Sequence, residues 1–151
     1  MEIERKFLVG AVPPGDHPRR GIEQGYLAVG DDGVEVRVRR ADAAITLTVK
    51  SGPGLVRVEE EISIDERRFE SLWPLTEGRR VVKTRHLVPL ADGLTAEVDV
   101  YDGALAGLLT AEIEFPSVAA SQAFAPPEWL GREVTGDERY ANRTLALRGA
   151  P

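Results

Sequence analysis

The sequence predicts a mainly β protein of the α+β class, in which antiparallel strands form a barrel with a charged lumen and a few helices cover the outside. Seven predicted strands alternate hydrophobic residues with full charges. The charged faces carry nearly equal numbers of acids and bases, and the three lysines of the chain all lie on them. Such a balance within one surface indicates that the charges face each other, as they do across the lumen of a barrel.

Composition limits the range of functions. The chain has 151 residues, 42% of them hydrophobic and 29% charged, which is typical of a single soluble domain spanning residues 1–151. A net charge of −6 argues against a general nucleic-acid binder, and the absence of cysteine excludes disulfides and thiolate sites. No apolar run has membrane-spanning length, and the candidate site begins at residue 2. We therefore expect a cytoplasmic enzyme or binding domain, with neither a nucleic acid nor a membrane as partner.

The first half of the chain contains five predicted strands, at residues 1–9, 24–29, 34–40, 45–50 and 55–64. A loop at residues 12–21, which includes Pro13-Pro14-Gly15, separates the first two strands. Turns at residues 30–33 and 40–43 make hairpins, and residues 51–54 interrupt the pattern once more.

The second half begins with a predicted helix, for which Asp65 is the N-cap and Pro74 the end. Strands follow at residues 80–89, 95–101 and 110–115. Ser117 caps a short helix that reaches Phe124, and a last helix covers about residues 137–147. The sequence contains no internal repeat, linker or low-complexity tract that would indicate a second domain.

The charged residues recur at every second position of the strands, so each set shares one face. A sandwich with one solvated face would also alternate, but such a face usually mixes serine, threonine and glutamine with lysine. The eight acids are Glu2, Glu4, Glu59, Glu61, Glu97, Asp99, Glu112 and Glu114, and the seven bases are Lys6, Arg37, Arg39, Lys50, Arg57, Lys83 and Arg85.

Lysine usage points to the same surface. Only three of the 19 basic residues are lysines, and these are Lys6, Lys50 and Lys83. Arginine cannot replace lysine where a compact point charge or an amine with an adjustable pKa is needed. The three positions are therefore candidates for a chemical role.

A lumen lined in this way suits the handling of polyanions. Guanidinium and ammonium groups match phosphate oxygens, and clustered carboxylates bind a hard divalent cation that bridges those oxygens. Phosphoryl transfer depends mainly on positioning and charge stabilisation, which a rigid barrel can supply.

The ordered motifs resemble those of the CYTH superfamily of triphosphate tunnel metalloenzymes, and the resemblance spans nearly the whole chain. The motifs are Glu2-x-Glu-x-Lys6, Gln24-Gly-Tyr-Leu27, Arg37-x-Arg39, Leu47-Thr-Val-Lys-Ser-Gly52, Arg57-x-Glu-x-Glu61, Lys83-Thr-Arg85, Glu112-Ile-Glu114 and the segment 133–142.

The resemblance implies an eight-stranded antiparallel closed barrel, a triphosphate tunnel, that binds a triphosphate with Mg²⁺ or Mn²⁺ and cleaves it. By motif, the metal-binding acids would be Glu2, Glu4, Glu112 and Glu114, with Asp99 beside them. The phosphates would be held by Arg37, Arg39, Lys50, Arg57, Lys83 and Arg85. Lys6 and Tyr26 match a lysine–tyrosine dyad that orients or activates the attacking water. Glu59 and Glu61 fit either a second metal or the fixing of neighbouring arginines.

The resulting hypothesis is a metal-dependent hydrolase that converts inorganic tripolyphosphate to pyrophosphate and phosphate. Its partner would be the small-molecule triphosphate, and the chain would act as a monomer or homodimer. The alternatives are an adenylate cyclase or thiamine triphosphatase of the same superfamily, or a non-catalytic polyphosphate- or nucleotide-binding module. Both E-x-E pairs favour the enzyme, since a mere binder would not need them.

Overall fold

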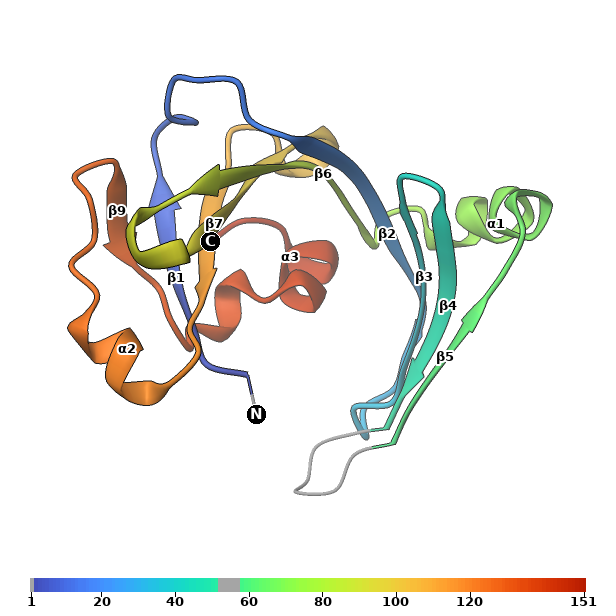
Figure 1. Cartoon of the computed structure of the whole chain (residues 1–151). Helices are drawn as coiled ribbons and strands as arrows, with labels where there is room; N and C mark the ends of the chain where they lie inside the picture. Colours follow the sequence, from blue (N-terminus) through green and yellow to red (C-terminus); the bar gives the residue numbers. More distant parts are fainter. Residues whose placement is uncertain (1, 52–57) are drawn as a thin grey trace.

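The computed structural model describes residues 2–51 and 58–151. In these residues one antiparallel sheet, with the strand order β5-β4-β3-β2-β6-β7-β8-β1-β9, curves around a central space (Figure 1). The strands are β1 Glu4–Val9, β2 Arg19–Val29, β3 Glu35–Ala41, β4 Ala44–Lys50, β5 Glu59–Ser63, β6 Arg80–Pro89, β7 Thr95–Tyr101, β8 Leu109–Glu114 and β9 Leu130–Glu133. The mainly β, antiparallel architecture is thus confirmed.

The eight-stranded closed barrel, however, is wrong in both strand number and closure. The described residues form nine strands, and no hydrogen-bonded pairing joins the two edge strands, β5 and β9. The outer edge of β1 is paired with β9, through Phe7 opposite Glu133 and Val9 opposite Leu130, so β1 has no free edge for β5. The strand β5 is consequently exposed along all five of its residues. The sheet is therefore open and strongly curved.

The long strand β2 joins the two halves of this sheet. It spans 11 residues and pairs with β3 on one side and β6 on the other. It begins at Arg19, so the predicted loop 12–21 is shorter than expected. The β3–β4 hairpin turns through Asp42, whose φ of 53° lies in the left-handed region that aspartate tolerates.

Helices α1 Glu66–Leu72 and α2 Val118–Ala123 lie outside the curve (Figure 1). Both predicted N-caps are confirmed, because the Asp65 and Ser117 side chains accept hydrogen bonds from backbone N–H groups of the first turns, at 2.8 and 3.0 Å. The α1 side chain Phe69 is buried and lies under the Arg40 guanidinium, 4.5 Å from it. No helix of the described residues is both long and apolar enough to cross a membrane.

The last predicted helix is divided in the structure. A single 3₁₀ turn, Glu138–Tyr140, precedes helix α3 Asn142–Arg148, and Ala141 between them has an extended backbone. Helix α3 lies inside the curve of the sheet (Figure 1). Its Leu145 and Ala146 form an apolar cluster with Tyr26, Val81 and Tyr101 of the strands. The helix therefore covers part of the concave face.

The other apolar cluster lies on the convex side of β1, β7 and β8. It contains Phe7, Val98, Ala111 and Ile113, all less than 3% exposed. Full burial of a large apolar side chain such as Phe7, Val98 or Ile113 stabilises a fold by about 1.5–3 kcal/mol. With the apolar positions packed on this side, the alternate positions of the same strands must face the concave side.

Candidate active site

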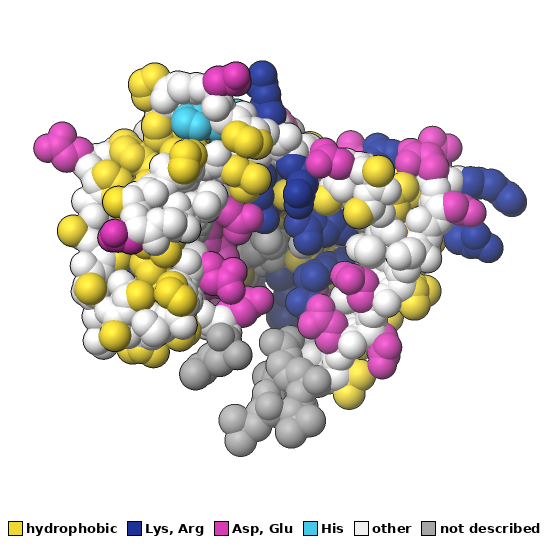
Figure 2. Space-filling model, in the orientation of Figure 1, with side chains coloured by type: hydrophobic (Ala, Val, Ile, Leu, Met, Phe, Trp, Pro, Cys, Tyr) yellow, Lys and Arg dark blue, Asp and Glu magenta, His cyan; other side chains and the backbone are white. Residues whose placement is uncertain are grey.

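Strand register places the predicted site residues on one face. Across β1 and β8, Glu4 lies opposite Glu114 and Lys6 opposite Glu112. The same face continues through the pairs Glu112–Glu97, Asp99–Arg85, Gln24–Arg39, Tyr26–Arg37, Arg37–Thr48, Lys50–Glu59 and Thr48–Glu61. Figure 2 shows acidic side chains on one flank of a hollow and lysine and arginine side chains across it. The sequence prediction of a single charged face is confirmed for the described residues.

We call Glu2, Glu4, Glu97, Glu112 and Glu114 the acidic wall; apart from Glu2, which precedes β1, they lie on β1, β7 and β8. A hydrogen bond with Glu112 raises the pKa of Glu4 to about 8, with further contributions from burial and from the charges of Glu112 and Glu2. Two carboxyls of this wall are thus close enough to share a proton. Such a pair disfavours full ionisation when no cation is bound.

The chemistry of this donor set fits a hard divalent cation. No three acidic or histidine side chains form a ready cage within residues 2–51 and 58–151. Mg²⁺ does not require such a cage, since it commonly uses one or two carboxylates and takes its other ligands from water and substrate phosphates. The Glu4–Glu112 pair, flanked by Glu2, meets this requirement.

We call Arg20, Arg37, Arg39, Lys50, Lys83 and Arg85 the basic wall; they lie on β2, β3, β4 and β6. The Nε atoms of Arg37 and Arg39 are buried and have no hydrogen-bond partner among the described residues. Burial, followed by the charges of Arg85, Arg37 and Arg20, lowers the pKa of Arg39. Four guanidinium groups are therefore held close enough to repel one another, an arrangement that a bound anion would stabilise.

Lys83, Asp99 and Arg85 form a buried ionic network between β6 and β7. Asp99 is 4% exposed, lies 2.9 Å from the Lys83 ammonium and accepts two hydrogen bonds from Arg85, at 2.9 and 3.1 Å. Burial opposes ionisation of Asp99, yet the hydrogen bonds from Arg85 and the charge of Lys83 lower its pKa. Burial also lowers the pKa of Lys83. These contacts favour a role for Asp99 in fixing Lys83 and Arg85 rather than in direct metal binding.

Lys6 and Tyr26 lie on strands that are separated by β8, β7 and β6. The Lys6 ammonium donates to the Tyr140 carbonyl at 2.7 Å, and Gln24 donates to the Tyr26 hydroxyl at 3.0 Å. Burial and the charge of Glu35 raise the pKa of Tyr26. Both effects disfavour the phenolate form of Tyr26, and Gln24 holds its hydroxyl.

The remaining predicted residues lie on β4 and β5. The Lys50 ammonium is 3.8 Å from the Glu59 carboxylate, and the Thr48 hydroxyl donates to Glu61 at 3.3 Å. The charge of Glu61 also acts on Arg39, whose pKa it raises against the larger opposing effects. This arrangement favours arginine fixing over a second metal. Arg57 lies outside the described residues.

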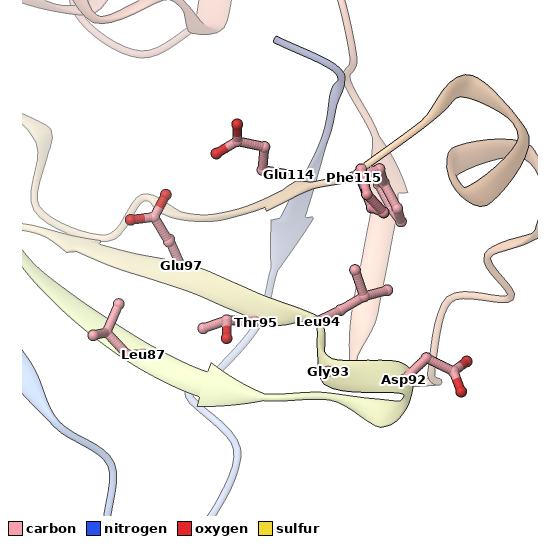
Figure 3. A pocket seen from close by; sticks show the side chains of 9 residues that line it. Leu87, Asp92, Gly93, Leu94, Thr95, Glu97, Glu114 and Phe115 are labelled. Carbon is pink, nitrogen blue, oxygen red and sulfur yellow. The ribbon is translucent and has the colours of Figure 1, made fainter.

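A cavity of about 560 Å³ opens beside the acidic wall (Figure 3). The carboxylates of Glu97 and Glu114 lie near each other at one side of it, and Leu94 and Phe115 contribute apolar surface (Figure 3). The cavity thus borders the acidic wall at Glu97 and Glu114, and none of the described residues that line it belongs to the basic wall.

Sequence reasoning missed three residues that face the site. Arg20 lies opposite Arg85, Gln24 opposite Arg39, and Glu35 opposite Lys50. Counting back in twos from Tyr26 reaches Gln24 and Arg20, and counting back in twos from Arg37 reaches Glu35. The period-two pattern that identifies these residues was therefore present in the sequence. Arg20 was not recognised because residues 12–21 were assigned to a loop.

Comparison with known proteins gives relatives along nearly the full chain, although no family model matches it. An inorganic triphosphatase of Nitrosomonas europaea is 51% identical over 146 residues, which cover 97% of each chain. An inorganic triphosphatase of Acetivibrio thermocellus is 40% identical over 152 residues, which cover 95% of this chain and 92% of the relative.

Solved structures give the same answer for the fold. A crystal structure of an inorganic triphosphatase superposes with a TM-score of 0.88 at 47% identity, and the match covers 100% of this chain and 97% of the other. A Hippeastrum adenylyl cyclase homologue, described as having a dominant triphosphatase activity, has a TM-score of 0.50 at 17% identity, with 81% and 83% of the two chains covered. The second likeness concerns the fold alone.

The curved antiparallel sheet of this chain is the fold that it shares with the inorganic triphosphatase structure. The identities of 51% and 40% to two inorganic triphosphatases extend over nearly complete chains, and they assign the family. The chain belongs to the inorganic triphosphatase family.

Proposed function

We propose that this protein hydrolyses inorganic tripolyphosphate to pyrophosphate and phosphate, with Mg²⁺ or Mn²⁺ as cofactor. The single observation that best supports the proposal is the pair of buried Nε atoms on Arg37 and Arg39 that have no acceptor among the described residues. A buried donor without a partner is costly, and phosphate oxygens would satisfy both. The activity named for the two relatives agrees with this chemistry.

In this proposal the basic wall binds and orients the phosphate chain. Arg37 and Arg39 offer planar forks that can bind phosphate oxygens in a bidentate manner. Lys50, Lys83 and Arg85 add point charges and donors from the neighbouring strands. Asp99 keeps Lys83 and Arg85 in place before substrate arrives, and such pre-organisation lowers the entropic cost of binding.

The acidic wall would hold the cation through Glu2, Glu4, Glu112 and Glu114. When bound there, Mg²⁺ or Mn²⁺ supplies Lewis-acid stabilisation of phosphoryl oxygens and offsets repulsion between the substrate and the carboxylates. The hydrogen bond with Glu112 that raises the pKa of Glu4 lies where a cation would relieve the repulsion between these carboxylates.

Hydrolysis requires a water oxygen to attack the terminal phosphorus while the bond from that phosphorus to the bridging oxygen breaks, which releases pyrophosphate. Lys6 keeps two further N–H donors beside the one given to Tyr140, and these can neutralise charge on a phosphate oxygen. Tyr26, held by Gln24, would orient the water through a neutral hydroxyl. The two residues would thus act from opposite walls rather than as one contacting dyad.

The test is phosphate release from tripolyphosphate, ATP, thiamine triphosphate and pyrophosphate, each with a series of divalent metals. We expect the fastest release from tripolyphosphate, and only when Mg²⁺ or Mn²⁺ is present. Faster formation of cyclic AMP from ATP, or binding of tripolyphosphate without any turnover, would contradict the proposal. The cytoplasmic location and the monomeric or homodimeric state stay predictions from the sequence.

A further inference from the structure

Glu35 is a buried carboxyl of the site to which the proposed reaction gives no role. It is the first residue of β3 and lies on the same face as Arg37, opposite Lys50 of β4. It is 6% exposed, and its Oε2 atom is buried without a hydrogen-bond partner among the described residues. Arg37 Nη1 lies 3.8 Å from that oxygen.

The charge of Glu35 acts on the interior of the site. After burial, it is the second cause of the raised pKa of Tyr26, whereas Arg37 acts in the opposite direction. A carboxylate that is removed from water and incompletely paired exerts a strong field on its neighbours, because solvent screens it poorly. Any anion bound close to Tyr26 would experience the same field.

Glu35 also marks the end of a row of cations. Arg39 and Arg37 stand two positions apart on β3, and Glu35 follows two positions further on, with about 6.6 Å between successive members of the row. Beyond it, the described part of this strand and its turn offers no base and instead carries Asp31 and Asp32. Along β3 the row therefore changes from cationic to anionic at Glu35, while Lys50 lies opposite it on β4.

We propose that Glu35 determines specificity for chain length by repelling a phosphate that extends past Arg37. Rejection by a like charge is a common way to discriminate between ligands that share all other contacts. This inference rests on the proposed function, because it presumes that a phosphate chain lies along Arg39 and Arg37. It adds a limit to how many phosphates the basic wall accepts.

The experiment compares the Kd values of tripolyphosphate and tetrapolyphosphate, measured by calorimetry with Mg²⁺ present, in the parent and in Glu35→Gln. Glutamine keeps the shape of the side chain and removes the charge. We expect tetrapolyphosphate to bind about tenfold more tightly to Glu35→Gln than to the parent, and tripolyphosphate no more than about threefold more tightly. Equal factors for the two ligands, no change, or weaker binding of tetrapolyphosphate would overturn the inference.

Two matched variants isolate the effect. Glu60→Gln removes one charge from an exposed position of β5 that pairs with Val49 on the opposite face, and it should leave the ratio of the two Kd values unchanged. Glu35→Asp keeps the charge and should keep the parental preference. If thermal melting shows that Glu35→Gln does not fold, Glu35→Ala is measured by the same criterion.

The outcome is separable from that of the proposed function. A parent that binds tripolyphosphate but releases no phosphate would contradict the proposed hydrolysis, while the ratio of Kd values would still decide the role of Glu35. A parent with full turnover and an unchanged ratio in Glu35→Gln would contradict only the length limit.

Discussion

The acidic and basic walls are built in different ways. On the acidic wall, Glu4 and Glu114 are exposed and Glu112 is half-buried, and the pKa of Glu4 is raised by its own neighbours. On the basic wall, the most tightly held charge, Lys83, is 4% exposed and is fixed by Asp99 and by Asn142 of α3. The acidic wall is the more exposed of the two and is short of positive charge. The basic wall is half-buried or buried except at Arg20, and Asp99 holds Lys83 and Arg85 in place.

The acidic and basic walls therefore differ in how far their side chains must be oriented before a ligand binds. Flexible, exposed carboxylates can adjust to a cation that brings its own waters and shares phosphate oxygens. Arginines that bind oxygens in a fixed geometry must instead be oriented beforehand, and buried counter-charges such as Asp99 do so. Mutations on the acidic wall should therefore act through the metal, and those on the basic wall through substrate geometry.

The largest effect should come from the acidic wall. Glu4→Gln removes one anionic ligand from a hard-ion site, so we expect turnover of tripolyphosphate to be abolished while the circular dichroism spectrum stays parental. The control is Glu128→Gln, an exposed position between α2 and β9. Parental turnover by Glu4→Gln at limiting Mg²⁺ would show that the acidic wall does not bind the cation.

The second-largest effect should come from Tyr26 of β2. Tyr26→Phe keeps the ring in its apolar cluster and removes only the oxygen that Gln24 holds. We expect kcat to fall about 10²-fold, because the hydroxyl that would orient the attacking water is lost, with the Kd of tripolyphosphate little changed. A parental kcat would leave Tyr26 with packing as its role.

A smaller effect should follow from Arg39, because its loss removes charge-assisted contacts without altering the reacting groups. Arg39→Ala should weaken tripolyphosphate binding by about 1.5 to 3 kcal/mol, or about 10- to 150-fold in Kd. Arg39→Lys should restore only part of this affinity, since an ammonium cannot bind in a bidentate manner. Arg67→Ala on the outer helix α1 is the control. Equal affinities of the parent and Arg39→Lys would refute bidentate recognition.

The smallest effect concerns stability and pH in the presence of EDTA. The folded-state pKa of Glu4 is raised from 4.5 to about 8, so its contribution to stability is fully present below about pH 4.5 and is lost as the pH rises through 8. Glu4→Gln removes this loss. We expect the Tm of the variant to exceed that of the parent by about 2 °C at pH 9 and to match it at pH 5. The same offset at both pH values would exclude the shared proton.

The fold was predictable where alternation is regular. Strands, caps and the common charged face follow from period-two patterns and from residues such as Asp65 and Ser117. Strand β9 was not predictable, since Leu-Gly-Arg-Glu is short and lacks alternation, and it exists because the edge of β1 accepts it. The prediction of a closed barrel was also wrong. Pairing between strands that are far apart in the sequence leaves no local signal from which closure could be judged.

The sequence predicted that the candidate site residues share one face, but it did not predict their spacing. Period two places Lys6 and Tyr26 on the charged face, yet only the strand order reveals that three strands lie between them. Likewise Asp99 has the same pattern as Glu97, and only the structure shows that Lys83 and Arg85 occupy its carboxylate. Which groups pair with a buried charge depends on the tertiary structure, so the local sequence pattern does not reveal them.

The free edge of β5 also matters for solubility. An unpaired strand edge can add a strand from another molecule, and charged side chains on that edge oppose such stacking. Glu59, Glu60 and Glu61 provide three adjacent negative charges there. Near the sequence pI of about 5.0, the net charge that keeps molecules apart also falls to zero. We therefore expect precipitation to be worst near pH 5, and concentrated solutions to keep best well above it.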